Sequence, residues 1–399
     1  MKYPPWLPIL LGFLTAVGPV SIDMYLPAFP VIAVALGNVP GAAQITLAAF
    51  FIGLAAGQMT QGPLSDRLGR RVPLIGGMIL YTLASIGCAL APGLLSFSLL
   101  RALAAFGGSA GMVVPRAIVR DLADGHAAAK LLSQLMLVMG AAPILAPTLG
   151  GLILGVAGWH AIFWVAALYG VACTVLVWAL LPDTLPVQRR VRIGLGGILS
   201  RYAQIGTERS FITHAATCVF GTAAMFCYIS GAAPVFIERY HVSPVVFGML
   251  FGVNASAYIV ASQINARLLP RFGAGRVLSA AVRVLVAATL VLTVNAASGW
   301  GGVVGLMLPL TASLGSLGFV LPTATVGALS RHSAHAGSAS ALMGTMQFTL
   351  GAIMGSLVGV ASDGTARPMA ILMLVCALGA AAADLCRPRE PGGMVRVPA

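Results

Sequence analysis

Twelve apolar stretches of about 20 residues constrain this chain more than any other feature. A helical stretch of that length matches the hydrocarbon thickness of a bilayer, and only helices or closed barrels can cross it. Hydropathy places the stretches near residues 6–28, 42–62, 73–92, 94–116, 131–155, 159–181, 211–237, 244–268, 277–297, 300–325, 337–360 and 368–386. The sequence therefore predicts an all-α polytopic membrane protein with twelve transmembrane helices.

Composition and charge agree with a bilayer as the chain's surroundings. Of 399 residues, 59% are hydrophobic and only 8% are charged, against roughly 25% charged in a soluble domain. The net charge of +13 would indicate nucleic acid in a soluble protein. Here the basic residues fall in short loops, which the positive-inside rule explains better. We expect lipid and not nucleic acid as a partner, and the six cysteines show no metal-binding spacing.

The basic loops also predict the orientation. When the connections are assigned alternately to the two sides, lysine and arginine gather on one side, and only Arg239 and Arg367 fall on the other. Basic loops stay cytoplasmic. Both termini are therefore expected in the cytoplasm, and the first span is expected to be an anchor and not a cleaved signal peptide.

The longest connection suggests a duplicated architecture of two pseudo-symmetric six-helix bundles. It divides the chain into a first bundle (1–182), a cytoplasmic linker (183–210) and a second bundle with a short tail (211–399). The second bundle repeats the loop at 62–71 in a worn form at 270–276, with Pro270 where the first loop has Asp66. The linker is open to two interpretations, a helix on the membrane surface or a flexible tether.

The polar loop at 62–71 is expected to act as a conformational hinge. Its glycines suit a sharp turn, its arginines can bind an anionic membrane surface, and its acid can cap a helix or form a breakable pair with arginine. The alternative is an ordinary basic loop kept cytoplasmic by its charge. The residues assigned to this function are Gly62, Asp66, Arg67, Gly69, Arg70 and Arg71.

Asp23 is the acid that lies clearly within a predicted span, near the outer end of the first one. An isolated carboxylate at membrane depth is costly when ionised, so its protonation should respond to access and to its neighbours. This is typical of a proton carrier. The alternative is an acid at the rim that faces water or caps a helix broken near Pro27.

Arg101 in the fourth span is the complementary cation. Counted at about 1.5 Å per residue from the outer ends of their spans, Asp23 and Arg101 lie at similar depth. If close, the guanidinium would stabilise the ionised carboxylate or hold a polar group of a substrate. The alternative is a structural arginine bonded to backbone carbonyls.

Two further sets of residues are candidates for transport. Pro143, Pro147, Gly150 and Gly151 give the fifth span a kinkable, closely packing helix. A second set consists of large or polar residues within spans that could line an adaptable cavity, although most residues of this kind only pack helices. Its members are Tyr25, Met136, Met139, Phe226, Tyr228, Asn254, Tyr258 and Gln347.

Several of these segments carry a family resemblance. Gly62, Leu64, Ser65, Asp66, Arg67, Gly69, Arg70 and Arg71 match the G-x-L-S-D-R-x-G-R-R loop of the major facilitator superfamily. Together with the segments 21–27, 101–108, 115–122 and 146–151, the sequence is similar to the drug:proton antiporters of the Bcr/CflA (bicyclomycin/chloramphenicol resistance) branch. The matches cover mainly residues 20–155. Ala146 departs from the pattern, which usually has glycine there.

The resemblance implies the major facilitator fold and drug/H⁺ antiport across the bacterial inner membrane. It implies Asp23 as the protonation site, Arg101 as its coupling partner and the fifth span as an antiporter feature. The expected partners are protons and a small amphiphilic drug. The transporter is expected to be a monomer that is driven by the proton gradient and needs no cofactor. The alternative is a proton-coupled exporter or importer of a small endogenous metabolite. No phosphate loop, zinc-protease motif or nucleophile elbow occurs, so we expect no enzyme.

Overall fold

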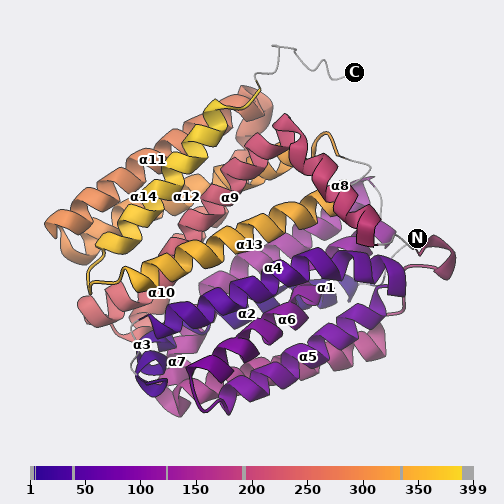
Figure 1. The fold of residues 1–399 in the computed structure, drawn as a ribbon, viewed down its shortest axis with the longest axis horizontal. Coiled ribbons are helices and arrows are strands. Elements are labelled where there is room, and N and C mark those ends of the chain that lie inside the picture. The colour runs from indigo at the N-terminus through magenta and orange to yellow at the C-terminus, as the bar shows by residue number, and fades with distance from the viewer. Residues whose placement is uncertain are drawn as a thin grey trace.

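The computed structural model consists of long helices that lie roughly side by side (Figure 1). The structure describes residue 4 and residues 6–37, 41–122, 125–190, 195–332 and 336–388. The helices are α1 Leu7–Thr15, α2 Val17–Ile22, η1 Leu26–Ala28, α3 Phe29–Ala35, α4 Ala42–Leu68, α5 Arg71–Ala89, α6 Leu94–Leu122, α7 Gly125–Leu180, η2 Val187–Arg189, α8 Leu195–Thr207, α9 Arg209–Ala233, η3 Pro234–Arg239, α10 Pro244–Phe272, α11 Ala274–Ser298, α12 Gly302–Leu329, α13 Ala336–Val360 and α14 Arg367–Leu385.

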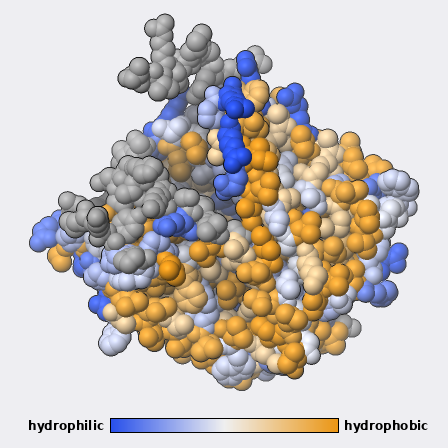
Figure 2. Space-filling model, turned by 180° about the vertical axis from the view of Figure 1, so that it is seen from behind, coloured by the Kyte–Doolittle hydropathy of each residue, from blue (hydrophilic) through white to orange (hydrophobic). Residues whose placement is uncertain are grey.

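The twelve predicted spans are found among these helices. Within the described residues, eleven helical segments are long and apolar enough to cross a membrane. One of them, Ala141–Leu180, turns at Gly158, where φ is 74° and ψ is 177°, so it supplies both the fifth and the sixth span. Large apolar side chains remain exposed on most spans, and Figure 2 shows them covering much of one face. This surface suits contact with lipid.

Several predicted span ends are wrong because the helical segment continues past the expected end. The first span continues to Ala35, the second to Leu68 and the fourth to Leu122. The residues added to the second and fourth spans include charged ones, which hydropathy excludes, whereas those added to the first span, 29–35, are apolar and follow its break. Arg120, which lies beyond the predicted end of the fourth span at residue 116, is therefore inside α6.

The helices form two groups joined along two contacts. Helices α1 to α7 are the first half, α9 to α14 are the second half, and α4 packs on α13 while α7 packs on α10 between them. Figure 1 shows α4 and α13 side by side across the middle. The domain boundaries expected from the sequence stay a prediction.

The linker contains a helix that docks on both halves. In α8, Tyr202 and Ile205 are buried, and the Tyr202 hydroxyl donates to the Met59 carbonyl oxygen of α4 (3.4 Å). Helix α8 also contacts α9 and α13. We call the end of the molecule that carries the α4–α5 turn, the linker and the end of α14 the basic end.

Candidate functional site

The first span is broken at Asp23. Helix α2 ends at Ile22, η1 begins at Leu26, and the Asp23 backbone N–H donates to the Pro19 carbonyl oxygen (2.9 Å). Prolines on both sides of the break remove backbone donors that a continuous helix would need. Because the span runs on to Ala35, Asp23 lies about 18 Å from its outer end. The expected position near the rim is wrong, and Asp23 is deeper.

The Asp23 carboxyl group lies where the two halves meet. Its residue is only 7% exposed, and η1, directly after it, contacts α9 and α10 of the second half. The carboxyl group is within electrostatic range of the Tyr228 hydroxyl in α9. Among the described residues, its oxygens form neither a hydrogen bond nor an ion pair.

Tyr228 belongs to a neutral hydrogen-bonded chain in the second half. The Asn254 side-chain amide donates to the Tyr228 hydroxyl (3.0 Å), and the Thr311 hydroxyl donates to the Asn254 side-chain oxygen (2.7 Å). The Tyr228 ring stacks on Phe251, with centroids 5.4 Å apart. The chain joins α9, α10 and α12 and ends at the Tyr228 hydroxyl.

Arg101 does not pair with Asp23. Its guanidinium is buried, at 2% exposed, and its Nη1 donates to the Ser21 carbonyl oxygen (2.9 Å). The guanidinium carbon lies 4.5 Å from the Tyr25 ring centroid and 4.3 Å from that of Phe50. Nε and Nη2 have no hydrogen-bond partner among the residues that the structure describes. In this conformation Arg101 binds the backbone two residues before Asp23. This arrangement agrees with the alternative of a structural arginine bonded to a backbone carbonyl. The coupling role of Arg101 stays a prediction.

A small cavity of about 10 Å³ lies beside Arg101, with Ser21, Tyr25 and Tyr81 in its lining. This volume suffices for about one water molecule. Tyr25 faces this cavity and bonds through its hydroxyl to Thr46. It is therefore packed inside the first half in this conformation.

The predicted antiporter helix is the first part of α7, and its glycines make the closest contacts near Asp23. A Cβ at Gly150 would overlap the Met24 carbonyl oxygen, and one at Gly151 would lie 2.8 Å from the Pro244 carbonyl oxygen of α10. Glycine is needed at both positions because backbone occupies the space of a side chain. Pro143 and Pro147 lie within the same helix.

Most of the other predicted cavity residues belong to the second half, and Met136 and Met139 belong to α7 of the first half. Phe226 stacks on Phe51 of the first half, with centroids 4.1 Å apart. Gln347 donates to the Thr222 hydroxyl (2.8 Å), and Tyr258 is partly buried in α10. The side chains of Met136 and Met139 lie outside the described residues. Contact of these residues with a substrate stays a prediction.

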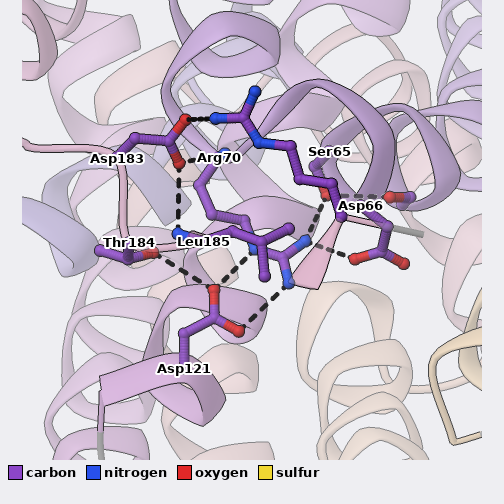
Figure 3. A network of polar contacts seen from close by, with 9 residues as sticks. Ser65, Asp66, Arg70, Asp121, Asp183, Thr184 and Leu185 are labelled. Carbon is purple, nitrogen blue, oxygen red and sulfur yellow. Dashed lines mark hydrogen bonds and ion pairs between the residues drawn. The ribbon is translucent and has the colours of Figure 1, made fainter. Parts of the chain in front are cut away.

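At the basic end, Arg70 holds the most extensive ionic contact of the first half (Figure 3). Its Nε lies 2.7 Å from Asp121 Oδ2, it pairs with Asp66, and its Nη1 donates to the Ser65 hydroxyl (2.9 Å). Burial alone would lower the pKa of Arg70, but the hydrogen bonds and charges of Asp121 and Asp66 outweigh burial and raise it. The guanidinium therefore stays charged.

The linker is tied to the same place. The Arg70 backbone N–H donates to Asp183 Oδ1 (2.9 Å), and Asp183 Oδ2 pairs with Arg190 (2.8 Å). Thr184 donates to Asp121 Oδ2 (3.2 Å). We call Ser65, Asp66, Arg70, Asp121 and Asp183 the Arg70 cluster. Asp121 and Asp183 were not among the predicted functional residues; their positions at the basic ends of the fourth and sixth spans were the available signal.

The hinge is shorter than the sequence predicted. Residues 62–68 continue α4, so the turn consists of Gly69, with φ at 91°, and Arg70. A Cβ at Gly62 would meet no atom within 4 Å, so the turn does not require that glycine. Arg67 is exposed, and Arg71 donates to the Trp178 carbonyl oxygen. The expected pairing of Asp66 with a nearby arginine is confirmed, and Arg70 also pairs with Asp121.

A metal centre does not emerge from these groups. Over the ranges that the structure describes, no three side chains of His, Cys, Asp or Glu come together in a way that could hold an ion.

Known proteins resemble this chain over most of its length. The chain is 37% identical to the "Uncharacterized MFS-type transporter YdgK" of Bacillus subtilis, over 93% of this chain and 92% of the relative. It is 32% identical to the bicyclomycin resistance protein homolog of Haemophilus influenzae, over 92% of each. It is 30% identical to a chloramphenicol resistance protein of Pseudomonas aeruginosa, over 92% of this chain and 87% of the relative.

Solved structures share the fold at low sequence identity. The human organic anion transporter MFSD10 superposes with a TM-score of 0.71 at 15% identity, over 97% of this chain and all of the other. A D-xylose-proton symporter gives the same score and identity over 95% of each chain. The family model described as Major Facilitator Superfamily matches residues 11–356. The chain is therefore a transporter that belongs to the Major Facilitator Superfamily.

Proposed function

We propose that this transporter exports small amphiphilic drugs across the bacterial inner membrane in exchange for protons, with both termini in the cytoplasm. The observation that carries the proposal is the position of Asp23, a buried carboxyl group at a break in the first span and at the junction of the halves. The names of two relatives, which refer to bicyclomycin and chloramphenicol resistance, support a drug as the substrate.

The break gives Asp23 the properties that coupling requires. An ionised carboxylate at membrane depth costs free energy unless a proton or another cation joins it. Binding of the proton and of the drug are thereby linked at one site. In the inward-facing state the ionised group accepts drug nearby; in the outward-facing state a proton displaces the drug and is released inside on return.

Alternating access requires the contacts between the halves to separate in turn. In this structure α3 contacts η3, η1 contacts α9, and Gln44 donates to the Ser230 carbonyl oxygen (3.3 Å). These contacts lie at the end opposite the basic end, so they close the proposed outer side. Tyr228 and Asn254 lie just inside this closure, where they would sense the protonation of Asp23.

The decisive experiment measures substrate-triggered proton movement in vesicles. Wild type and Asp23→Asn are compared with phenicol, bicyclomycin-like, sulfonamide and cationic compounds. Wild type should release protons from an acid interior and the variant should not. Asp363→Asn is the matched control, because Asp363 is an exposed acid outside the spans.

Each other result has a defined meaning. Normal proton exchange by Asp23→Asn would show that coupling occurs elsewhere. If wild type responds to no drug, but moves protons with a small metabolite, the alternative of a metabolite transporter replaces drug export.

A further inference from the structure

The second half contains a large cavity that the transport site does not use. Its volume is about 1410 Å³, and it lies between α10, α11 and α12, with the basic ends of α9 and α14 beside it. Helices α10 and α11 both pack closely on α12, whereas their contact with each other is slight. The space between them forms a groove, which we call the α10–α12 groove. Neither Asp23 nor Tyr228 lines it.

The wall of the groove is largely apolar and open at its side. Leu269, Phe272, Val284, Phe319 and Val326 are among its lining residues, and Phe272, Val284 and Val326 are each more than half exposed. Exposed apolar residues on a membrane span contact lipid chains. The groove is therefore accessible from the membrane.

The length of the groove suits an acyl chain. Its lining follows α12 from Ala312 to Ser330, which are 18 residues apart and so roughly 27 Å along the helix. One leaflet occupies about 15 Å of hydrocarbon, half of the core. A complete acyl chain can lie along the groove.

The mouth at the basic end is cationic. Arg276, Arg283 and Arg387 line it together with one acid, Asp384. Asp384 pairs with Arg387 (3.3 Å). Arg276 and Arg283 form no ion pair with any described residue. They are seven residues apart on α11 and so share one face of that helix.

Arg283, which lies deeper in the span than Arg276, points its guanidinium toward the mouth of the groove. Arg283 Nε donates to the Ser279 carbonyl oxygen (3.2 Å), one turn nearer the basic end. An arginine in this arrangement buries its stem along apolar surface and places its charge at the interface. Two guanidiniums without a carboxylate thus lie above an apolar groove.

We propose that the α10–α12 groove binds an anionic glycerophospholipid from the leaflet at the basic end. One acyl chain lies between α10 and α11, and the phosphate contacts Arg276 and Arg283. An apolar groove below an unneutralised cationic mouth complements a molecule with an acyl chain and a negative headgroup. A neutral drug would leave the two guanidiniums without a counter-charge.

Lipid titration followed by native mass spectrometry tests this proposal. Phosphatidylglycerol is added to the purified full chain in detergent, and its apparent Kd is compared with that of phosphatidylcholine. Wild type should prefer phosphatidylglycerol. Arg276→Gln/Arg283→Gln should weaken that binding roughly 25-fold, about fivefold for each charge removed.

Two further variants separate charge from fit. Arg267→Gln/Arg271→Gln removes the same charge from exposed residues at the end of α10 that do not line the groove, and its affinity should stay at the wild-type value. Ala280→Phe keeps every charge but fills the groove, because Ala280 lines it, and it should also lose binding.

Three results would overturn the proposal. Equal losses in the two arginine double variants would mean that binding follows net charge and not the groove. Unchanged binding by Ala280→Phe would place the lipid outside it. Competitive displacement of phosphatidylglycerol by a transported drug would make the groove a substrate site.

Discussion

The two halves have the same turn between their second and third spans, but the arginine beside it comes from a different segment in each half. Gly69 and Gly273 both adopt positive φ, 91° and 79°, between the second and third spans of their halves. In the first half, Arg70 of the turn supplies the cation, and its guanidinium pairs with Asp66 and Asp121. Its backbone N–H binds Asp183, which follows the sixth span. In the second half, Arg387 after the twelfth span supplies the cation, donating to the Gly275 carbonyl oxygen (3.0 Å).

The halves also differ in how their helices fill space. In the first half, Gly77 of α5 and Gly107 of α6 face each other so closely that a Cβ at Gly77 would lie 2.6 Å from the Gly107 carbonyl oxygen. In the second half, a Cβ at Gly315 of α12 would have only the Ala257 carbonyl oxygen near it, at 4.0 Å. The repeated topology thus gives a closely packed, ion-paired half and a half with an open groove.

Arg70→Ala should produce the largest difference between the halves. It leaves the partly buried Asp121 without its cation, so we expect a loss of about 3 kcal/mol in the free energy of unfolding. Arg271→Ala, in the worn repeat of the loop, should cost less than about 0.5 kcal/mol because Arg271 is exposed. Unfolding in mixed micelles measures both, and equal losses would refute the asymmetry.

Alanine at Gly77 in the first half and at Gly315 in the second half should change stability in opposite directions. Gly77→Ala must displace backbone and should cost about 2 kcal/mol. Gly315→Ala adds helix propensity in open space and should stabilise by roughly 0.5 kcal/mol. The same unfolding assay applies, and a loss at Gly315 would show that the groove is narrower than described.

Removing one tyrosine hydroxyl from each half should separate function from stability. Tyr228→Phe breaks the hydrogen bond from Asn254, and Tyr169→Phe breaks the one to the Phe13 carbonyl oxygen. Each should cost about 1 kcal/mol of stability. Proton exchange should slow roughly fivefold only in Tyr228→Phe, which lies beside Asp23. Equal exchange rates in vesicles would remove Tyr228 from the coupling site.

The acids at the ends of the last spans of the halves, Asp183 after the sixth and Asp384 in the last turn of the twelfth, should give the smallest effect. Asp183→Asn loses an ion pair whose side chains are each 27% exposed, and we expect a cost of about 0.5 kcal/mol. Asp384 is less exposed, at 8%, so Asp384→Asn should cost more, about 1 kcal/mol. Thermal unfolding in detergent can rank the two losses of stability. A larger loss in Asp183→Asn than in Asp384→Asn would contradict the prediction.

Hydropathy predicted the fold because lipid demands helices, but it could not predict the ends or the contacts. The polar residues 62–68 are helical although they lie outside the apolar core. Asp121 and Asp183 are 51 and 113 residues from Arg70, and a single sequence does not show such pairs. For Asp23, counting residues placed the carboxyl group too near the rim because the span runs on to Ala35. The direction of the Asp23 and Arg101 side chains depends on the break at Asp23.

The distance along the chain between Arg70 and Asp183 determines when the Arg70 cluster can form during synthesis. Asp183 follows Arg70 by 113 positions, so at about 5–20 residues per second its synthesis comes roughly 6–23 s later. Throughout that interval Arg70 lacks the carboxylate that binds its backbone. The Arg70 cluster is completed only when all six spans of the first half and the start of the linker have been made. A ribosome that stalls earlier therefore leaves a first half in which the Arg70 backbone N–H lacks its carboxylate partner.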